Sequence, residues 1–482
     1  MDVVSNFIAG QWVAGDAAIE NRSPSDVTDL IGLYAQASPA QVHVAAAAAR
    51  EAQPRWAATG LEARGAVLDA VGRELMARSA ELGRLLSREE GKPLAEGVGE
   101  VYRAGQFFTY FAAEVLRILG DNADSVRAGV EIGITREALG TVGIISPWNF
   151  PMATAAWKIA PALAFGNAVI WKPANLTPAS AHALTEIVSR QAIPTGLFNL
   201  VMGPGAELGR VLAGEADIEG LSFTGSCEVG RQVAAAAAPC FVKLQLEMGS
   251  KNPLVVMDDA DLDRAVDIAV NGAFGGTGQK CTASSRLIVH RPIHDAFVER
   301  LVSRARALRV GHALAEGTQM GPVVSAAQLA GNLDYVALAR REGGEVACGG
   351  ERIDGPAEGF YMSPAVVLNT RSGMRVNQEE MFAPITCVIP ADDLDHAIAL
   401  ANDTAFGLTA GIATQSLARA TRFRRASRSG CVMVNLPTAG TDYHVPFGGV
   451  RGSSYGPREQ GRNAIEFYTQ VKTAYVFAGE AV

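Results

Sequence analysis

The stretch TVGIISPWNFPMATAAWKIAPALAFGNAVIWK, residues 141–172, decides the fold. Apolar runs at 141–145 and 167–171 have the length of buried strands, and the alanine-rich segment 153–164 between them is typical of a helix. A strand, a helix and a second strand in this order predict two parallel strands joined by a crossover helix. The alternation continues with helices predicted at 178–191 and 206–213 and strands predicted at 197–201 and 220–224. We therefore expect a parallel sheet with helices on both faces, the pattern of a dinucleotide-binding domain.

The segments on either side of this series extend the α/β pattern. Apolar residues at helical spacing predict helices at 41–58, at 61–90 with a stop at Gly91-Lys92-Pro93, and at 96–119. After residue 248 a second series begins, with a strand at 253–257, a helix from 261, a strand at 286–290, and further elements to about 435. At 482 residues the chain is too long for one ordinary core, so we expect two or three domains.

Two strand-like segments stand apart from both series, at 126–137 and 464–476. Each alternates apolar and polar residues, which is the pattern of a half-buried strand. We expect these two segments to pair with each other. A ribbon of this kind has unpaired edges, which favours association with another subunit.

Composition and charge exclude several classes of protein. The net charge is −8 and the basic residues are scattered, which argues against nucleic acid or an anionic membrane as a partner. No apolar run approaches the ~18 residues of a membrane span, and the N-terminus lacks the pattern of a signal peptide. The six cysteines form no CxxC pair, so we expect no metal site and no disulfide framework. These features together predict a cytoplasmic protein.

Cys281 and Glu247 are the first two candidates for chemistry. Cys281 follows the flexible loop GGTG at 275–278, and the basic Lys280 beside it would favour a nucleophilic thiolate. Glu247 ends an apolar segment, where burial would raise its pKa toward the range of a general base. From the residues alone, a buried structural cysteine and a salt bridge from Glu247 to Lys243 remain the alternatives.

Further candidates lie at the predicted carboxyl ends of strands. Asn149, in PWNFP at 147–151, has an amide that can donate to an oxyanion, although an asparagine capping a turn is commoner. Gly225, in FTGSCEVG at 223–230, would let a phosphate approach a helix N-terminus. The chain lacks a GxGxxG fingerprint, so this turn is weak evidence alone. Lys172 is a candidate ribose or phosphate ligand or a solvated lysine, and Glu380 is unremarkable by itself.

Seven segments taken jointly resemble the NAD(P)-dependent aldehyde dehydrogenase superfamily over nearly the whole chain. In order along the sequence they are PWNFP, WKPAN, FTGSCEVG, LEMGSKNP, GQKCTAS, EEMFAP and VPFGGVRGSSYGPREQG. The resemblance implies an enzyme that oxidises an aldehyde to a carboxylic acid through a thiohemiacetal and a thioester on Cys281. Asn149 and the Cys281 backbone N–H then stabilise the oxyanion, and Glu247 deprotonates the water that releases the acid.

The resemblance also implies a nicotinamide dinucleotide cofactor, NAD or NADP. The residues that match the family's cofactor-binding positions are Trp148, Lys172, Asn175, Gly225, Ser226, Gly230, Glu380 and Phe382. Asn175 departs from the family pattern, because NAD-preferring members often carry a glutamate there that repels a 2′-phosphate. With the neutral Asn175 beside Lys172, NADP stays open as a cofactor. Arg451 stands where lysine is common, which we interpret as a surface change.

The implied fold is an α/β architecture with two doubly wound parallel-sheet domains and a small β-ribbon that builds a homodimer or homotetramer. We place the dinucleotide-binding domain at 1–120 and 139–248, the catalytic domain at 249–445, and the oligomerisation ribbon at 121–138 and 460–482.

Within the superfamily, the tail of the chain is most similar to the α-ketoglutaric semialdehyde (2,5-dioxopentanoate) dehydrogenases. The similar segments are LPTAGTDYHVP at 436–446 and the stretch that follows it from Gly452. A semialdehyde acid needs a cation or several donors at the mouth of the site, and Lys280, Thr438 and Thr441 are the candidates. Succinic semialdehyde and simple aldehydes are the alternative substrates.

Three other hypotheses about the function of the chain stay open at this stage. The first is a CoA-acylating enzyme, against which Glu247 argues because that route needs no base for water. The second is a non-catalytic dehydrogenase-like binding protein, against which the intact set of Cys281, Glu247 and Asn149 argues. The third is a cysteine hydrolase, for which only His444 lies near a matched motif.

Overall fold

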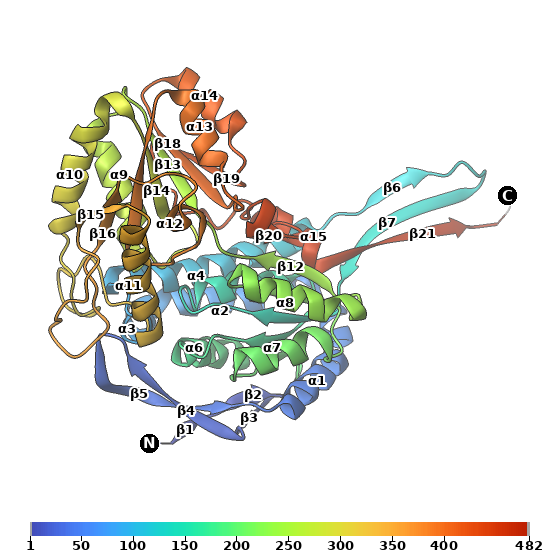
Figure 1. The fold of residues 1–482 in the computed structure, drawn as a ribbon. Coiled ribbons are helices and arrows are strands. Elements are labelled where there is room, and N and C mark those ends of the chain that lie inside the picture. The colour runs from blue at the N-terminus through green and yellow to red at the C-terminus, as the bar shows by residue number, and fades with distance from the viewer. Residues whose placement is uncertain (1, 480–482) are drawn as a thin grey trace.

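The fold is that of a computed structural model, which describes residues 2–479, and it is built around two large sheets (Figure 1). In spatial order, the first sheet consists of β20 (Ser454–Tyr455), β12 (Lys243–Glu247), β11 (Gly220–Thr224), β8 (Thr141–Ile145), β9 (Ala168–Lys172), β10 (Phe198–Leu200), β2 (Asn6–Ile8) and β3 (Gln11–Val13). The five strands from β12 to β10 are parallel, and the edge strands run antiparallel. Every residue of β9 is buried, because helices cover both faces of the sheet.

The helices of this first unit divide between the two faces. On one face α1 packs against α7 and α7 against α8, while on the other α4 packs against α5 and α3 against α6. Their bounds are α1 (Pro39–Ala57), α2 (Leu61–Ala77), α3 (Ser79–Glu90), α4 (Leu94–Glu114), α5 (Ala153–Ala164), α6 (Pro178–Ser189), α7 (Gly205–Gly214) and α8 (Cys227–Ala237). Local sequence sets several of these ends: Ser226 caps α8 through its hydroxyl, and α3 stops at Gly91, whose φ of +100° suits glycine.

The second large sheet is parallel except at one edge. In spatial order it consists of β15 (Glu345–Cys348), β16 (Ala365–Leu368), β17 (Ile385–Ala391), β14 (Ser284–His290), β13 (Asn252–Val256), β18 (Thr409–Ala413) and β19 (Cys431–Val434). The helices that accompany it are α9 (Leu262–Phe274), α10 (His294–Arg306), α11 (Ala326–Arg341), α12 (Arg375–Gln378), α13 (Leu394–Asn402) and α14 (Leu417–Ala426). The predicted fold class, with two parallel sheets each covered by helices, is therefore confirmed.

Two small sheets complete the described chain. A ribbon of β6 (Asp121–Asp124), β7 (Val130–Ala138) and β21 (Thr469–Phe477) projects from the body, and β7 and β21 pair antiparallel as their alternation predicts (Figure 1). Near the N-terminus, β5 (Asp26–Gln36) pairs with both β1 (Val3–Val4) and β4 (Ala17–Ser23).

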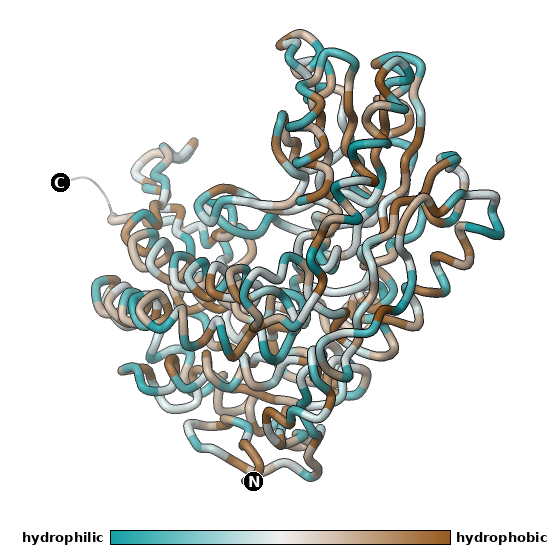
Figure 2. Tube along the Cα trace, turned by 90° about the vertical axis from the view of Figure 1, so that its left-hand side faces the viewer, coloured by the Kyte–Doolittle hydropathy of each residue, from teal (hydrophilic) through white to brown (hydrophobic). Residues whose placement is uncertain are grey.

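Hydrophilic residues gather on the outer turns and helix faces of the body (Figure 2). No helix within residues 2–479 is both long and apolar enough to cross a bilayer.

The structure differs from the sequence-based expectations in three places. The helix predicted at 61–90 breaks at Arg78, whose ψ of +14° leaves the helical region and whose guanidinium pairs with Glu74 and Glu81 on either side. The segment predicted as a strand at 464–476 contains a short helix, α15 (Ile465–Tyr468), before the strand starts at Thr469. The N-terminal strands were not predicted, because most of them are too short to show a period.

Candidate active site

A cavity of about 220 Å³ lies where the carboxyl ends of the first sheet meet the loops of the second unit. The loop after β8 contributes Asn149, and the end of β12 contributes Glu247. The loop before β14 contributes Cys281, while Glu380 and Phe382 come from the segment before β17. Residues more than a hundred positions apart in the sequence thus line one space, at the edge of a parallel sheet where α/β sites form.

Cys281 follows a tight glycine-rich turn, η3 (Gly275–Gly278), in which Thr277 has a φ of +58°. Asn252 fixes the nucleophile's backbone by donating from Nδ2 to the Cys281 carbonyl at 2.8 Å. Burial raises the pKa of the Cys281 thiol, and the nearby carboxylates Glu380 and Glu247 raise it further. Lys280 does not favour the thiolate as predicted, because its ammonium lies 3.0 Å from Glu96 and pairs with that carboxylate.

Glu247 ends β12 with only 3% of its surface exposed. Burial is the main cause that raises the pKa of its carboxyl well above the usual range, and the charge of Glu459 adds to it. Ser454 donates from Oγ to Glu247 Oε2 at 2.5 Å, which opposes this rise in pKa. The alternative salt bridge to Lys243 is not formed, because the Lys243 ammonium donates to the backbone carbonyls of Glu466 and Thr469. A carboxyl with this environment suits a general base.

The amide of Asn149 is held between the two halves of the site. Its Nδ2 donates to the backbone carbonyl of Gln279 at 2.9 Å, two residues before Cys281. One of the two amide hydrogens is used in this bond, and the side chain lines the cavity with the second available. The Asn149 amide and the Cys281 thiol therefore face one cavity, an arrangement that suits stabilisation of an oxyanion.

The turn between β11 and α8 forms a cradle with a helix N-terminus. Gly225 and Ser226 line the cavity, and a Cβ at Gly230 would lie 2.3 Å from Met248 Sδ. A side chain at position 230 would therefore require the Met248 side chain to move. The Thr224 hydroxyl oxygen is buried and lacks a hydrogen-bond partner within the described residues, as expected where a polar ligand binds.

Lys172 and Asn175 lie together at the end of β9. Burial lowers the pKa of Lys172 to about 8, and within residues 2–479 its Nζ donates only to the Pro173 carbonyl. Asn175 donates to Gln36 Oε1 at 3.1 Å, while its own Oδ1 is buried without a partner in residues 2–479. These unsatisfied groups fit the ribose and phosphate oxygens of a dinucleotide.

Glu380, Trp148 and Phe382 border the same cavity. The rings of Trp148 and Phe382 meet edge to face with centroids 5.4 Å apart. Burial raises the pKa of Glu380 to about 7, although Ser250 N donates to the carboxylate at 2.8 Å. Five of the eight predicted cofactor positions line the cavity, while Lys172 and Asn175 lie at the end of β9 and Gly230 lies in the first turn of α8.

The three predicted substrate residues are not brought into the cavity. Lys280 turns toward Glu96, and Thr438 is fully buried, with its hydroxyl bonded to Ser284 and to the Thr282 carbonyl. Thr441 lies in the loop after Thr438 and does not line the cavity. In residues 2–479 no group of His, Cys, Asp and Glu is arranged to hold a metal ion.

An aromatic series that the sequence analysis missed leads away from the cavity. Trp157 and Phe447 line the cavity with ring centroids 5.7 Å apart, and Phe107 lies 5.7 Å beyond Trp157. Phe107 in turn meets Tyr443, and the Arg103 guanidinium lies 5.3 Å from the Tyr443 ring. Arg103 forms no ion pair within the described part of the chain. The sequence could not predict this series. Helical spacing shows that residues 103 and 107 share a face of α4, but it does not show which residues that face contacts.

Comparison with known sequences identifies one family. The family model described as "Aldehyde dehydrogenase family" matches residues 12–474. An alpha-ketoglutaric semialdehyde dehydrogenase of Bacillus subtilis is 39% identical over 98% of this chain and 97% of the relative. A betaine aldehyde dehydrogenase of Brucella melitensis is 38% identical over 99% of this chain and 98% of that protein.

Solved structures share the fold over nearly the full length. A betaine aldehyde dehydrogenase of Staphylococcus aureus in complex with NAD+ has a TM-score of 0.96 at 31% identity, covering 99% of this chain and 95% of that one. An E. coli NADP-dependent enzyme has a TM-score of 0.94 at 34% identity, covering 98% of each chain.

The carboxylates around the thiol predict its reactivity. Replacing Glu380 by Gln removes a charge that raises the pKa of Cys281, so iodoacetamide should alkylate Cys281 several-fold faster at a fixed neutral pH. The rate is measured by mass spectrometry of the Cys281 peptide in the absence of any ligand. The control is Glu379→Gln, since Glu379 pairs with Arg375 on the surface. An unchanged rate in Glu380→Gln contradicts this account of the thiol.

Proposed function

This chain belongs to the aldehyde dehydrogenase family, and we propose that it oxidises the aldehyde group of α-ketoglutaric semialdehyde. The enzyme oxidises an aldehyde with NAD(P)+ and water, giving a carboxylate, NAD(P)H and two protons. The observation that carries the catalytic assignment is the convergence of Cys281, Glu247 and Asn149 on one cavity beside the dinucleotide cradle.

The first half of the proposed reaction takes place at Cys281. The thiol first releases its proton to water, and the thiolate adds to the aldehyde carbon while the Asn149 amide and the Cys281 N–H stabilise the oxygen that becomes negative. When bound, the nicotinamide cofactor accepts the hydride, and the acyl group remains on Cys281 as a thioester. The residues that would hold the cofactor are the β11–α8 turn, Lys172, Asn175 and Glu380.

The second half depends on Glu247. Its raised pKa makes the carboxylate a stronger base than an ordinary glutamate, and it takes a proton from the water that attacks the thioester. The C–S bond then breaks, releasing the carboxylic acid and restoring the Cys281 thiol. The buried position of Glu247 in the same cavity supports this role.

The positive charge of Arg103, at the end of the aromatic series that leads from the cavity, supports an anionic substrate. Three relatives are named for α-ketoglutarate semialdehyde or 2,5-dioxopentanoate, but similar relatives are named for betaine aldehyde, which is a cation. Arg103, which forms no ion pair with any residue from 2 to 479, stands at the end of the aromatic series and would attract a carboxylate and repel a quaternary ammonium.

The ribbon supports a further part of the proposal, that the cytoplasmic enzyme is a homodimer or homotetramer. Strand β21 forms one edge of its small sheet, so its outer backbone groups lack a partner strand within the described chain. Val471, Tyr475 and Phe477 on this strand are exposed, which is typical of a surface that another copy covers.

The substrate proposal is tested by kcat/KM with α-ketoglutaric semialdehyde, succinic semialdehyde, alkanals and betaine aldehyde, each with NAD and NADP. We expect the highest value for α-ketoglutaric semialdehyde and free acid as the product. Replacing Arg103 by Met should raise KM roughly tenfold or more for the anionic aldehydes and leave alkanals unchanged, while Arg103→Lys retains most of the affinity. A preference for uncharged or cationic aldehydes overturns the substrate, and dependence on CoA overturns the hydrolytic route.

Replacing Glu247 by Gln should separate the two halves of the reaction. The first-turnover burst of reduced cofactor should persist, while steady-state turnover falls by roughly 10²–10⁴. Since Glu247 acts only when ionised and its pKa is raised, wild-type hydrolysis of the thioester should increase with pH above the range of an ordinary glutamate. This pH dependence should vanish in the variant. Stopped-flow absorbance checks both results, and Cys281→Ala, the control, should show neither burst nor turnover.

Replacing Asn175 by Glu should make the enzyme select NAD. The added carboxylate would repel a 2′-phosphate, so kcat/KM with NADP should fall roughly tenfold or more relative to NAD. The neutral Asn175→Gln variant is the matched control and should preserve the wild-type ratio. If the ratio of the two cofactors stays the same in Asn175→Glu, position 175 does not face the 2′ substituent.

A further inference from the structure

A buried lysine lies beneath the loop that carries Asn149. Lys92, in the turn between α3 and α4, is 3% exposed, and its Nζ donates to the Asn149 backbone carbonyl at 2.6 Å. The same ammonium lies 2.7 Å from Glu100 Oε2 and 4.1 Å from the centre of the Phe150 ring. Lys92 therefore contacts two consecutive residues of the loop through a group that has no access to solvent.

Glu100 fixes the other end of the same loop. Its Oε1 accepts from the backbone N–H of Met152 at 3.0 Å and of Ala153 at 3.2 Å. These are the first free donors of α5, so Glu100 caps that helix while its second oxygen holds Lys92. The segment from Asn149 to Ala153 is thereby held at both ends by one ion pair.

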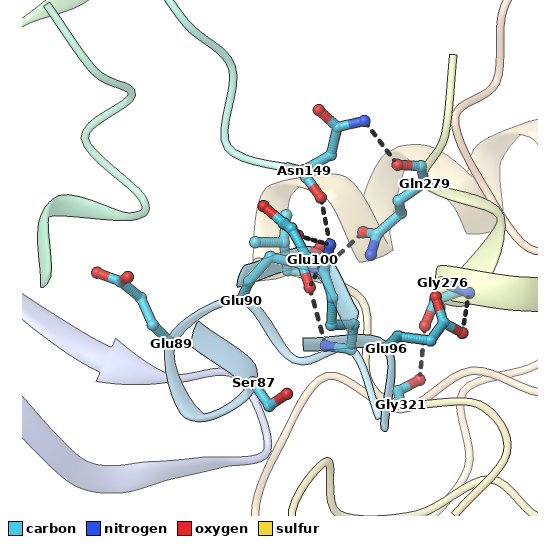
Figure 3. A network of polar contacts seen from close by, with 12 residues as sticks. Ser87, Glu89, Glu90, Glu96, Glu100, Asn149, Gly276, Gln279 and Gly321 are labelled. Carbon is cyan, nitrogen blue, oxygen red and sulfur yellow. Dashed lines mark hydrogen bonds and ion pairs between the residues drawn. The ribbon is translucent and has the colours of Figure 1, made fainter. Parts of the chain in front are cut away.

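The same helix also holds the loop of the nucleophile. Glu96, one turn before Glu100 on α4, accepts from Gly276 N at 3.0 Å and pairs with Lys280 at 3.0 Å. Residues four positions apart share a helix face, so Glu96 and Glu100 can reach the two catalytic loops side by side. The bond from Asn149 Nδ2 to the Gln279 carbonyl then joins the loops above them (Figure 3).

Stability alone does not account for this arrangement. Lys92, Glu90 and Glu100 are all buried, and burying an ion pair costs about as much as the pair returns. Glu90 accepts from the Lys92 backbone N–H at 2.8 Å and completes the cluster. The buried charges instead fix backbone groups: Lys92 and Glu100 bind the loop that carries Asn149, and Glu90 binds the turn that carries Lys92.

We propose that Lys92, held by Glu100, is a positioning residue that sets the Asn149 amide against the reacting oxygen. The proposal rests on the proposed role of Asn149 as the oxyanion donor. Lys92 itself touches neither substrate nor cofactor; it acts by fixing the backbone from which the Asn149 side chain projects. A displacement of the donor by a fraction of an ångström is enough to weaken oxyanion stabilisation.

A double-mutant cycle between Lys92 and Asn149 tests this. The full-length variants Lys92→Met, Asn149→Ala and the double variant are compared by the rate of the first-turnover burst. We expect Lys92→Met to slow the burst roughly tenfold to a hundredfold in the wild-type background and less than about twofold in the Asn149→Ala background. The dissociation constant for NAD, measured by fluorescence quenching, should stay unchanged.

Glu89→Gln is the matched control. Glu89 is as buried as Glu90 but turns away from the cluster and accepts from Ala179 N and Ser180 N (Figure 3). Its replacement should lower the thermal midpoint without slowing the burst. If Lys92→Met does not fold, Glu100→Gln replaces it in the cycle, since the amide oxygen still caps α5 while the charge that orients Lys92 is lost.

Two outcomes overturn the proposal. One is an equal loss from Lys92→Met with and without the Asn149 side chain, which would show a general effect on the fold. The other is an unchanged burst rate in both backgrounds. Failure of the proposed function is distinguished because wild-type protein would then lack the burst, whereas a failed cycle leaves wild-type turnover intact.

Discussion

The hydrogen bond from the Asn149 amide to the Gln279 carbonyl joins the two halves of the molecule at the point of chemistry. Asn149 follows a strand of the first sheet, and Gln279 lies in the loop that precedes a strand of the second. Neither half contains a complete site. The packing of one unit on the other therefore determines the distance between the Cys281 thiol and the Asn149 amide. Glu96 and Glu100 of α4 restrict that packing through their ion pairs with Lys280 and Lys92.

Acidic groups dominate the electrostatics of the cavity. Glu247 and Glu380 both face the thiol, and in each case burial favours the protonated form of the carboxyl. Each negative charge disfavours a second one nearby. A charge on Glu380 or Glu247 therefore raises the pKa of the Cys281 thiol. Lys92 and Lys280 are each bound to a carboxylate of α4. The charges of Lys158 and Arg458 oppose the rise in the pKa of Glu247, and that of Lys251 opposes the rise in the pKa of Glu380.

Much of the fold follows from local patterns in the sequence. The strand at 220–224 has the predicted bounds because a short apolar run between turn residues has few alternatives. The helix break at Arg78 was not predicted, since neither glycine nor proline marks it and ion pairs to Glu74 and Glu81 accompany it. At the site, the motifs singled out Asn149, Glu247 and Cys281, which line one cavity, but they missed the lining residues Trp157 and Phe447. It did not predict that Lys280 faces Glu96, or that Arg103 stands beside Tyr443, because such contacts depend on how distant segments pack.

The raised pKa of Cys281 also bears on oxidative damage. Peroxides attack thiolates rather than thiols, so a cysteine that stays protonated is oxidised slowly. Cys240, by contrast, is exposed on the surface between α8 and β12. We therefore expect a mild oxidant to modify the exposed Cys240 before it modifies Cys281, so that the first oxidation of the protein leaves the cavity intact.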